Sequence, residues 1–210
     1  VIKEQFLNSR AVMLGKDSYI APIWELVNHK VNSFPFVSTF DGISTPNYSP
    51  RKSELTLSYG YKSSIGRVFN YGFFCEESIV FSLPFSVNLE DYNFKLICKG
   101  LELNKDKILF NSFDGKFVID GLPIATVNKP LFVKNYFEKI IDLTNLKDIP
   151  QDFLSKIVSI NYLRRKEILD ELKLIDNFSS RMISRAINYE MGLISHVWLK
   201  PYNPINDQGL

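Results

Sequence analysis

The stretch ELTLSYGYKSSIGRVFNYGFF, residues 54–74, passes from a strand pattern to a helix pattern. In its first part, Leu55, Leu57 and Tyr59 alternate with polar residues, which predicts a half-buried strand ending at Tyr59. In its second part, residues 64–72 predict a short helix. Its buried side is supplied by apolar and aromatic residues, namely Ile65, Val68, Phe69 and Tyr71.

The sequence around this stretch predicts further short strands. Gly, Pro, Ser and aromatic residues are dense in the first half of the chain, and its periodic segments are brief. Residues 30–52 predict a long loop with a short strand near 36–40, and residues 108–119 predict a hairpin turning at Asp114-Gly115. The other strands are expected at residues 18–23, 79–83 and 94–98.

The last third changes to helical spacing. Apolar residues recur at intervals of three and four within residues 133–141, 153–175 and 182–198, which predicts three helices. Asp176, Asn177 and Ser179 are candidate caps for the third helix. The basic run Arg164-Arg165-Lys166 is interpreted as a solvated helix face rather than a phosphate contact. The predicted fold class is α+β, a β-rich half followed by a mainly helical lobe.

Composition limits the classes of function. The chain has 210 residues, 45% of them hydrophobic and 23% charged, which indicates a soluble globular protein. A net charge of +2 gives neither nucleic acid nor an anionic membrane a field to recognise, so neither is an expected partner. Two cysteines and two histidines are too few for a disulfide framework or a typical zinc site. We therefore expect reduced cysteines, no metal, and an intracellular, cytoplasmic location.

Common catalytic motifs are absent from the sequence. There is no glycine-rich phosphate loop, no nucleophile elbow and no HExxH motif. A Cys/His dyad would require Cys75 or Cys98 to meet His29, and nothing in the spacing predicts that meeting.

Three ordered segments carry a more specific signal. They are Asn8-Ser-Arg10, then PIWELVNH at residues 22–29, then ELTLSYG at residues 54–60, which is followed by KSS at 62–64 and YGFF at 71–74. In this order and at these separations they resemble the C-terminal half of a SET-domain methyltransferase. The resemblance covers residues 5–75 and is to the branch of the Rubisco large-subunit lysine methyltransferase and the actin-histidine methyltransferase. Glu25 stands for the usual Asp, and Ser64 stands for the usual Asn.

The resemblance implies a fold, a cofactor and a set of site residues. The β-rich half would be the pseudo-knotted SET fold, in which the Asn-His segment is threaded through a loop of later residues. The cofactor would be S-adenosyl-L-methionine. Tyr59 would be the catalytic residue at the methyl-transfer centre. The resemblance assigns the cofactor to Asn28, His29 and Arg10, and the walls of the substrate channel to Tyr71, Phe73 and Trp24.

The implied function is methyl transfer to a side chain of a protein substrate, with lysine favoured over histidine. Residues 1–82 would be the C-terminal half of a SET-like domain, and residues 83–210 a lobe resembling a substrate-binding domain. Nothing before Asn8 supplies the family's glycine-rich cofactor segment, so we expect a missing N-terminal half or a partner chain. The alternative is a catalytically inactive protein-binding module that retains a SET remnant. In that case Asn28 could cap a turn, His29 could be a satisfied core histidine, and Tyr59 could simply end a strand.

Overall fold

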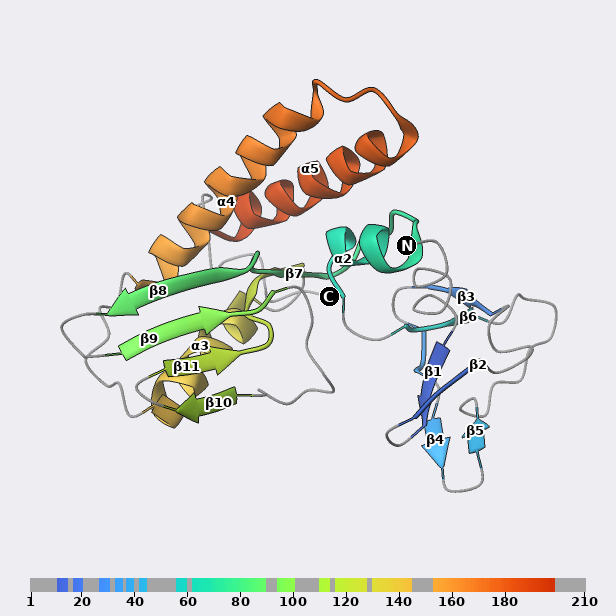
Figure 1. The fold of residues 1–210 in the computed structure, drawn as a ribbon, viewed down its shortest axis with the longest axis horizontal. Coiled ribbons are helices and arrows are strands. Elements are labelled where there is room, and N and C mark those ends of the chain that lie inside the picture. The colour runs from blue at the N-terminus through green and yellow to red at the C-terminus, as the bar shows by residue number, and fades with distance from the viewer. Residues whose placement is uncertain are drawn as a thin grey trace, which may run out of the picture.

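The fold is a mixture of helices and sheets, as predicted (Figure 1). It was examined in a computed structural model. The structure describes residues 11–14, 17–20, 27–30, 33–35, 37–39, 42–44, 56–59, 62–89, 94–100, 110–113, 116–127, 130–144 and 153–198.

A four-stranded sheet forms the centre of the second half. Its strand order is β10-β11-β9-β8, with β9 and β11 parallel and the other two pairs antiparallel. Phe113 pairs with Lys116, which confirms the predicted hairpin. The strand predicted at 94–98 is also confirmed, whereas β8 was not predicted. The bounds are β8 Phe85–Leu89, β9 Phe94–Cys98, β10 Phe110–Phe113 and β11 Lys116–Ile119.

Three helices cover this sheet and the neighbouring pair of β7 (Ile79–Phe81) and β12 (Pro123–Thr126). All three were predicted. None of the described helices is long and apolar enough to cross a membrane. Buried residues of β7, β9, β11 and β12 form one core with α3, α4 and α5, and Val80, Leu122, Ile124 and Val133 are 0% exposed. The helices are α3 Pro130–Thr144, α4 Phe153–Leu172 and α5 Phe178–Trp198.

The strands of the first half are short and paired in twos. β1 and β2 are antiparallel, as are β4 and β5, while β3 and β6 are parallel. Strand pairing in β6 covers only Thr56 and Leu57, shorter than predicted, and residues 54 and 55 lie outside the described ranges. The bounds are β1 Ala11–Leu14, β2 Asp17–Ile20, β3 Asn28–His29, β4 Val37–Thr39, β5 Gly42–Ser44 and β6 Thr56–Leu57.

The predicted short helix is present as α2 (Ser64–Tyr71), but its buried side differs from the prediction. Ser63 caps it by accepting a hydrogen bond from the Gly66 amide at 3.1 Å. Gly72, at φ 74°, ends it in the left-handed conformation that favours glycine. Phe69 was expected inside and is 56% exposed, whereas Arg67 is fully buried. Arg67 is tolerated there because it has a buried carboxylate partner, which helical spacing alone does not reveal.

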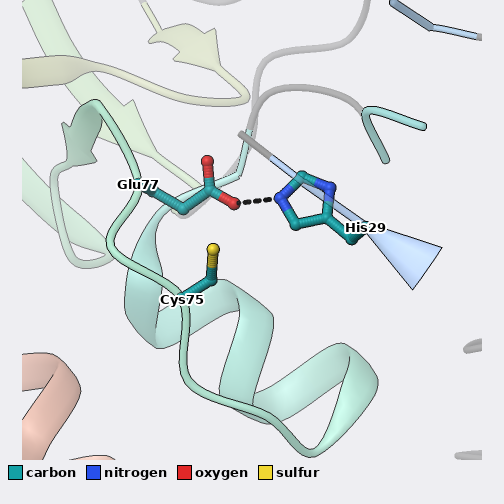
Figure 2. Close-up of side chains that lie close together, drawn as sticks. All are labelled: His29, Cys75 and Glu77. Atoms are coloured by element: carbon teal, nitrogen blue, oxygen red, sulfur yellow. Dashed lines mark hydrogen bonds and ion pairs between the residues drawn. The ribbon is translucent and has the colours of Figure 1, made fainter. Parts of the chain in front are cut away.

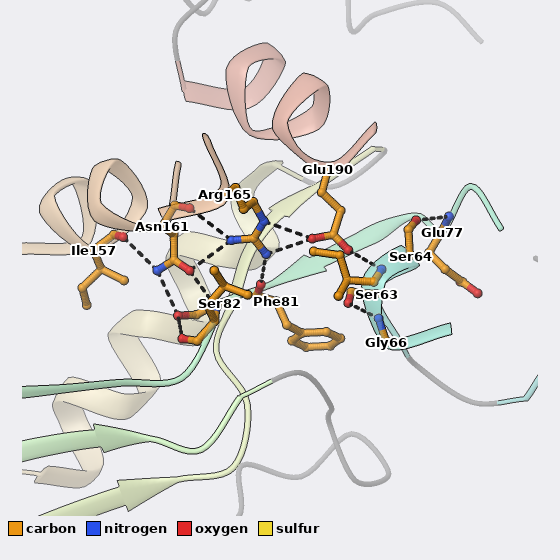
Figure 3. A network of polar contacts seen from close by, with 12 residues as sticks. Ser63, Ser64, Gly66, Glu77, Phe81, Ser82, Ile157, Asn161, Arg165 and Glu190 are labelled. Carbon is orange, nitrogen blue, oxygen red and sulfur yellow. Dashed lines mark hydrogen bonds and ion pairs between the residues drawn. The ribbon is translucent and has the colours of Figure 1, made fainter. Parts of the chain in front are cut away.

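A buried ion pair joins α4 to α5 (Figure 3). Arg165 donates to Glu190 from Nε at 3.1 Å and from Nη2 at 2.8 Å, and both side chains are 0% exposed. The interpretation of residues 164–166 as a solvated face is therefore wrong for Arg165, although Arg164 and Lys166 are exposed. Burial raises the pKa of the Glu190 carboxyl, and the Arg165 guanidinium opposes this rise.

The same pair holds elements far apart in the sequence. Arg165 donates from Nη2 to the Phe81 carbonyl of β7 at 2.7 Å and from Nη1 to Asn161 Oδ1 at 3.1 Å. Glu190 accepts the Ile65 amide of α2 at 2.8 Å through its other oxygen (Figure 3). These contacts cross the domain boundary expected between residues 82 and 83, so α2 is fixed against the helical lobe.

Replacing Arg165 with Met should destabilise the protein by about 3–5 kcal/mol, because Glu190 would keep a buried and uncompensated charge. The matched control is Arg164→Met, which removes one exposed hydrogen bond to the Pro84 carbonyl and should cost about 1 kcal/mol or less. Urea denaturation followed by circular dichroism measures both. Equal midpoints for the two variants would contradict this account of the pair.

Candidate active site

Five of the seven predicted site residues lie in the described ranges, and four of these gather in one cluster. The ring centroids of Tyr59 and Tyr71 are 5.2 Å apart, and those of His29 and Tyr59 are also 5.2 Å apart. The Phe73 ring belongs to the same cluster, with its centroid 5.9 Å from that of Tyr71 and 6.1 Å from that of His29. Asn28 is exposed on β3 beside His29. Arg10 and Trp24 lie outside the described residues.

The backbone explains how segments distant in sequence meet. β6 lies between two parts of the segment that contains β3. The Lys30 amide donates to the Leu57 carbonyl at 3.1 Å, and the Ser58 amide donates to the Phe34 carbonyl at 3.1 Å. Successive residues of a strand direct their hydrogen bonds to opposite edges. Residues 28–30 and residues 33–35 therefore lie on opposite edges of the strand that continues from β6, and Tyr59 lies next to His29.

Tyr59 is held at three atoms. Its hydroxyl donates to the Val27 carbonyl, and its amide donates to His29 Nδ1 at 3.1 Å. Its carbonyl accepts from Arg67 Nη1 at 3.2 Å. Both the ring and the main chain of Tyr59 are therefore fixed by side chains and backbone from other segments.

The hydrogen bonds of His29 determine its tautomer. Nδ1 accepts the Tyr59 amide proton, so the proton of the neutral imidazole lies on Nε2. Nε2 is 3.0 Å from Oε1 of Glu77 and donates to it (Figure 2). The imidazole is 1% exposed and the Glu77 side chain 7%. Both ring nitrogens therefore make hydrogen bonds, and the ring is almost completely shielded from solvent.

Arg67 and Glu77 complete the polar part of the site, and the sequence predicted neither. Arg67 Nε donates to the same Glu77 oxygen at 2.5 Å. The Arg67 guanidinium carbon lies 5.5 Å from the Tyr71 ring centroid, a cation–π distance. A buried Arg–Glu pair ten residues apart leaves no periodic signal in a sequence, so only its structural neighbours identify it.

Cys75 lies beside this cluster, a proximity that the sequence did not predict (Figure 2). Ligand atoms of His29, Cys75 and Glu77 lie within 4.8 Å of one another, and all three residue types bind zinc. A metal at Nε2 would leave the His29 ring without a proton, because Nδ1 already accepts the Tyr59 amide. The Arg67 guanidinium on the same Glu77 oxygen would also repel a cation. The donors therefore suit their own ion pairs better than a divalent metal.

The same contacts disfavour a Cys75 nucleophile. A nucleophilic cysteine needs a base that takes its proton or a field that favours the thiolate. His29 has no ring nitrogen left to accept the proton. Burial raises the pKa of the Cys75 thiol, and the charge of Glu77 raises it further. The proximity of Cys75 and His29 therefore does not make a catalytic dyad.

Comparison of the chain with protein-family models, curated proteins and solved structures found no match.

Both cysteines are free thiols, and both should react slowly with iodoacetamide in the folded protein. Burial raises the pKa of Cys98 to about 11, which leaves roughly 0.1% thiolate at pH 8 against about a quarter for an ordinary thiol. We expect Cys98 to react at least a hundredfold more slowly than in the unfolded chain, and Cys75 to be slowed less. Peptide mass spectrometry after timed alkylation measures both rates, with the urea-unfolded chain as control. Faster alkylation of Cys75 in the folded protein than in the unfolded chain would contradict the conclusion that Cys75 and His29 form no catalytic dyad.

Proposed function

We propose that this chain belongs to an S-adenosyl-L-methionine-dependent SET-type protein methyltransferase that acts on a lysine side chain, with histidine as the second choice of target. The observation that carries the proposal is the meeting of the two motifs behind the resemblance. Tyr59 and the Asn28-His29 pair are far apart in sequence, yet the Tyr59 amide bonds to the His29 ring across 30 residues. A chance pair of short motifs has no reason to meet in this way.

The β3–β6 arrangement supports the pseudo-knotted form of the SET fold. In that fold the Asn-His segment passes through a loop of later residues, and such threading is rare. Here residues 28–30 contact one edge of the strand at residues 56–58 and residues 33–35 contact the other, which is the kind of neighbourhood that threading would produce. We accordingly assign residues 1–82 to the SET-like half and residues 83–210 to a substrate-binding lobe.

The aromatic cluster supports the proposal of a channel that accepts a lysine amine in its charged or its neutral form. Tyr59, Tyr71 and Phe73 present ring faces, which attract an ammonium group and also accommodate apolar methylene groups. An apolar environment lowers the pKa of an entering lysine amine and so favours its neutral, nucleophilic form. Lys62 Nζ, 5.7 Å from the Tyr71 ring centroid, shows that a cation is tolerated at this ring.

Tyr59 would orient the acceptor nitrogen. Its hydroxyl proton is donated to the Val27 carbonyl, which directs the remaining lone pairs of the oxygen away from that carbonyl. Those lone pairs can accept an N–H of the amine and align the nitrogen lone pair with the reacting carbon. S-adenosyl-L-methionine would supply a methyl group on a sulfonium sulfur. The amine would form the new N–C bond, and the sulfur would keep the electron pair of the broken S–C bond.

The remaining assignments follow from the resemblance and from the chemistry of each side chain. Asn28 is exposed and, as an amide, can both donate to and accept from the amino-acid part of the cofactor. His29 has both ring nitrogens engaged, so we assign it a main-chain contact to the cofactor and the positioning of Tyr59. Arg10 is proposed as a further cofactor residue and Trp24 as a further wall of the channel. We propose that a glycine-rich segment outside the described residues or on a partner chain also contacts the cofactor, that the substrate is a protein, and that the location is cytoplasmic.

An inactive protein-binding module is the second candidate. It is favoured by apolar residues exposed where α4 meets α5, namely Leu174 at 88%, Ile175 at 50% and Phe178 at 68%. Large apolar side chains exposed this close together in the sequence are consistent with a docking surface. Cofactor binding separates the two candidates, because a module without catalysis has no need of it.

Replacing Tyr59 with Phe should lower the methyl-transfer rate at saturating substrate by about a hundredfold or more, because the amine would lose its orienting acceptor. The dissociation constant for S-adenosylhomocysteine should change by less than about threefold. Methyl transfer from radiolabelled cofactor to protein substrates, with the longest chain that the gene encodes, measures the rate. Tyr19→Phe, at a tyrosine 49% exposed, is the control. Unchanged turnover in the Tyr59 variant would contradict the assignment.

Replacing Asn28 with Ala should weaken S-adenosylhomocysteine binding by about tenfold, the loss of one or two hydrogen bonds. Isothermal titration calorimetry measures this, first with this chain and then with the glycine-rich segment supplied. Asn88→Ala, at an exposed asparagine of β8, is the matched control and should bind like wild type. If wild type shows no saturable binding in either form, the protein-binding module becomes the better account.

A further inference from the structure

One carboxylate oxygen of Glu77 accepts hydrogen bonds from the two side chains that bind the main chain of Tyr59. Oε1 of Glu77 accepts from Arg67 Nε at 2.5 Å and from His29 Nε2 at 3.0 Å. Each of these two side chains also makes a hydrogen bond to the main chain of Tyr59. His29 Nδ1 accepts the Tyr59 amide at 3.1 Å, and Arg67 Nη1 donates to the Tyr59 carbonyl at 3.2 Å. The four residues therefore form a closed circle of hydrogen bonds, which we call the Tyr59 circle.

The position of the His29 ring proton in the Tyr59 circle depends on the Glu77 carboxylate. A carboxylate only accepts, so it keeps the imidazole proton of His29 on Nε2 and leaves Nδ1 free to accept the Tyr59 amide. Without that carboxylate the proton could move to Nδ1. Two N–H groups, those of His29 and Tyr59, would then face each other at a distance of 3.1 Å. The buried Arg67 side chain, which is 0% exposed, would also lose its ion pair with Glu77.

Glu77 itself is fixed from two sides. Its amide donates to Ser64 Oγ at 3.2 Å, and its carbonyl accepts from the Tyr189 hydroxyl of α5 at 3.1 Å. Ser64 is the first residue of α2, and its hydroxyl donates to the Cys75 carbonyl at 2.6 Å. The carboxylate is therefore presented by a backbone that α2 and α5 hold in place.

We propose that Glu77 is a positioning residue for the methyl-transfer centre. It sets the tautomer of His29 and the orientation of Arg67, and through them it fixes the main chain of Tyr59. The proposal rests on the proposed function, in which Tyr59 orients the acceptor nitrogen. A displacement of about 1 Å at such a group can cost about a hundredfold in rate, so an indirect role of this kind has a measurable effect.

The test compares Glu77→Gln with Glu76→Gln, the same chemical change at the adjacent, exposed glutamate. Nuclear magnetic resonance of the full chain labelled with 15N-histidine reports which ring nitrogen of His29 carries the proton, with exposed His196 as internal reference. We expect the Nε2–H tautomer in wild type and in E76Q, and a shift toward Nδ1–H in E77Q. We also expect kcat of E77Q to fall about 10- to 100-fold with KM for the protein substrate within about threefold, while E76Q stays within twofold of wild type.

A second variant separates positioning from charge compensation. Arg67→Met combined with Glu77→Gln removes both buried charges, so it should fold even if E77Q alone does not. If the double variant recovers wild-type turnover, Glu77 serves only to neutralise Arg67 and the proposal is overturned. An unchanged Nε2–H tautomer with normal turnover in E77Q also overturns it. If wild type transfers no methyl group, the proposed function fails, and the catalytic part of this proposal fails with it. The tautomer measurement still decides whether Glu77 organises the Tyr59 circle.

Discussion

The arrangement of the two halves depends on the buried ion pair of Arg165 and Glu190. Taking two charges out of water costs several kcal/mol for each ion, and their mutual attraction offsets this only when the remaining hydrogen-bonding groups are satisfied. Here that condition is met by groups from three elements: the Phe81 carbonyl of β7, the Asn161 side chain of α4 and the Ile65 amide of α2. An arrangement that moved any of these elements would leave a charge unsatisfied. The pair therefore selects one arrangement among several that hydrophobic packing alone would allow.

Helix α2 connects this pair with the candidate site. Its first turn receives Glu190, and its next turn carries Arg67, which bonds to Glu77 and to the Tyr59 carbonyl. The apolar side of α2 packs on α5, where Ile65 meets buried Ala186 and Ile187. Two buried Arg–Glu pairs thus lie along one short helix. The position of the aromatic cluster is set by the helical lobe as much as by the strands around it.

Helices and strands with regular apolar spacing were predicted correctly from the sequence. The burial of residues that belong to ion pairs was not predicted. The three long helices and the strand Phe94–Cys98 follow from regular apolar spacing, and the structure has them. Arg165 and Phe69 were assigned to the wrong sides of their helices, because a charged residue is placed outside unless its partner is known. Of the three candidate caps Asp176, Asn177 and Ser179, the structure uses Asn177, whose Oδ1 accepts from the Ser180 amide three residues on.

In the candidate site, too, some residues are identified by sequence motifs and others only by their contacts in the fold. That His29 and Tyr59 would lie together was implied by the order of the motifs and not by any local propensity, and strands of two residues are too short to give one. Arg67, Cys75 and Glu77 were not assigned, because their relation to His29 exists only after the chain has folded. The residues that carry a recognisable motif could be named as candidates from the sequence, whereas the residues that contact them in the fold could not.

The β3–β6 pairing also has a consequence for the order in which the molecule assembles. It is a ladder of two residues that closes a long loop, so it carries a large loss of chain entropy and few bonds to offset it. The β7–β12 pair of the second half also closes a long loop, but its residues lie in the buried core, and that burial offsets the loss of chain entropy. The Tyr59 circle would therefore complete folding last and open first, as a local unfolding event that leaves the lobe intact. A bound cofactor would add its binding energy where the native state is weakest.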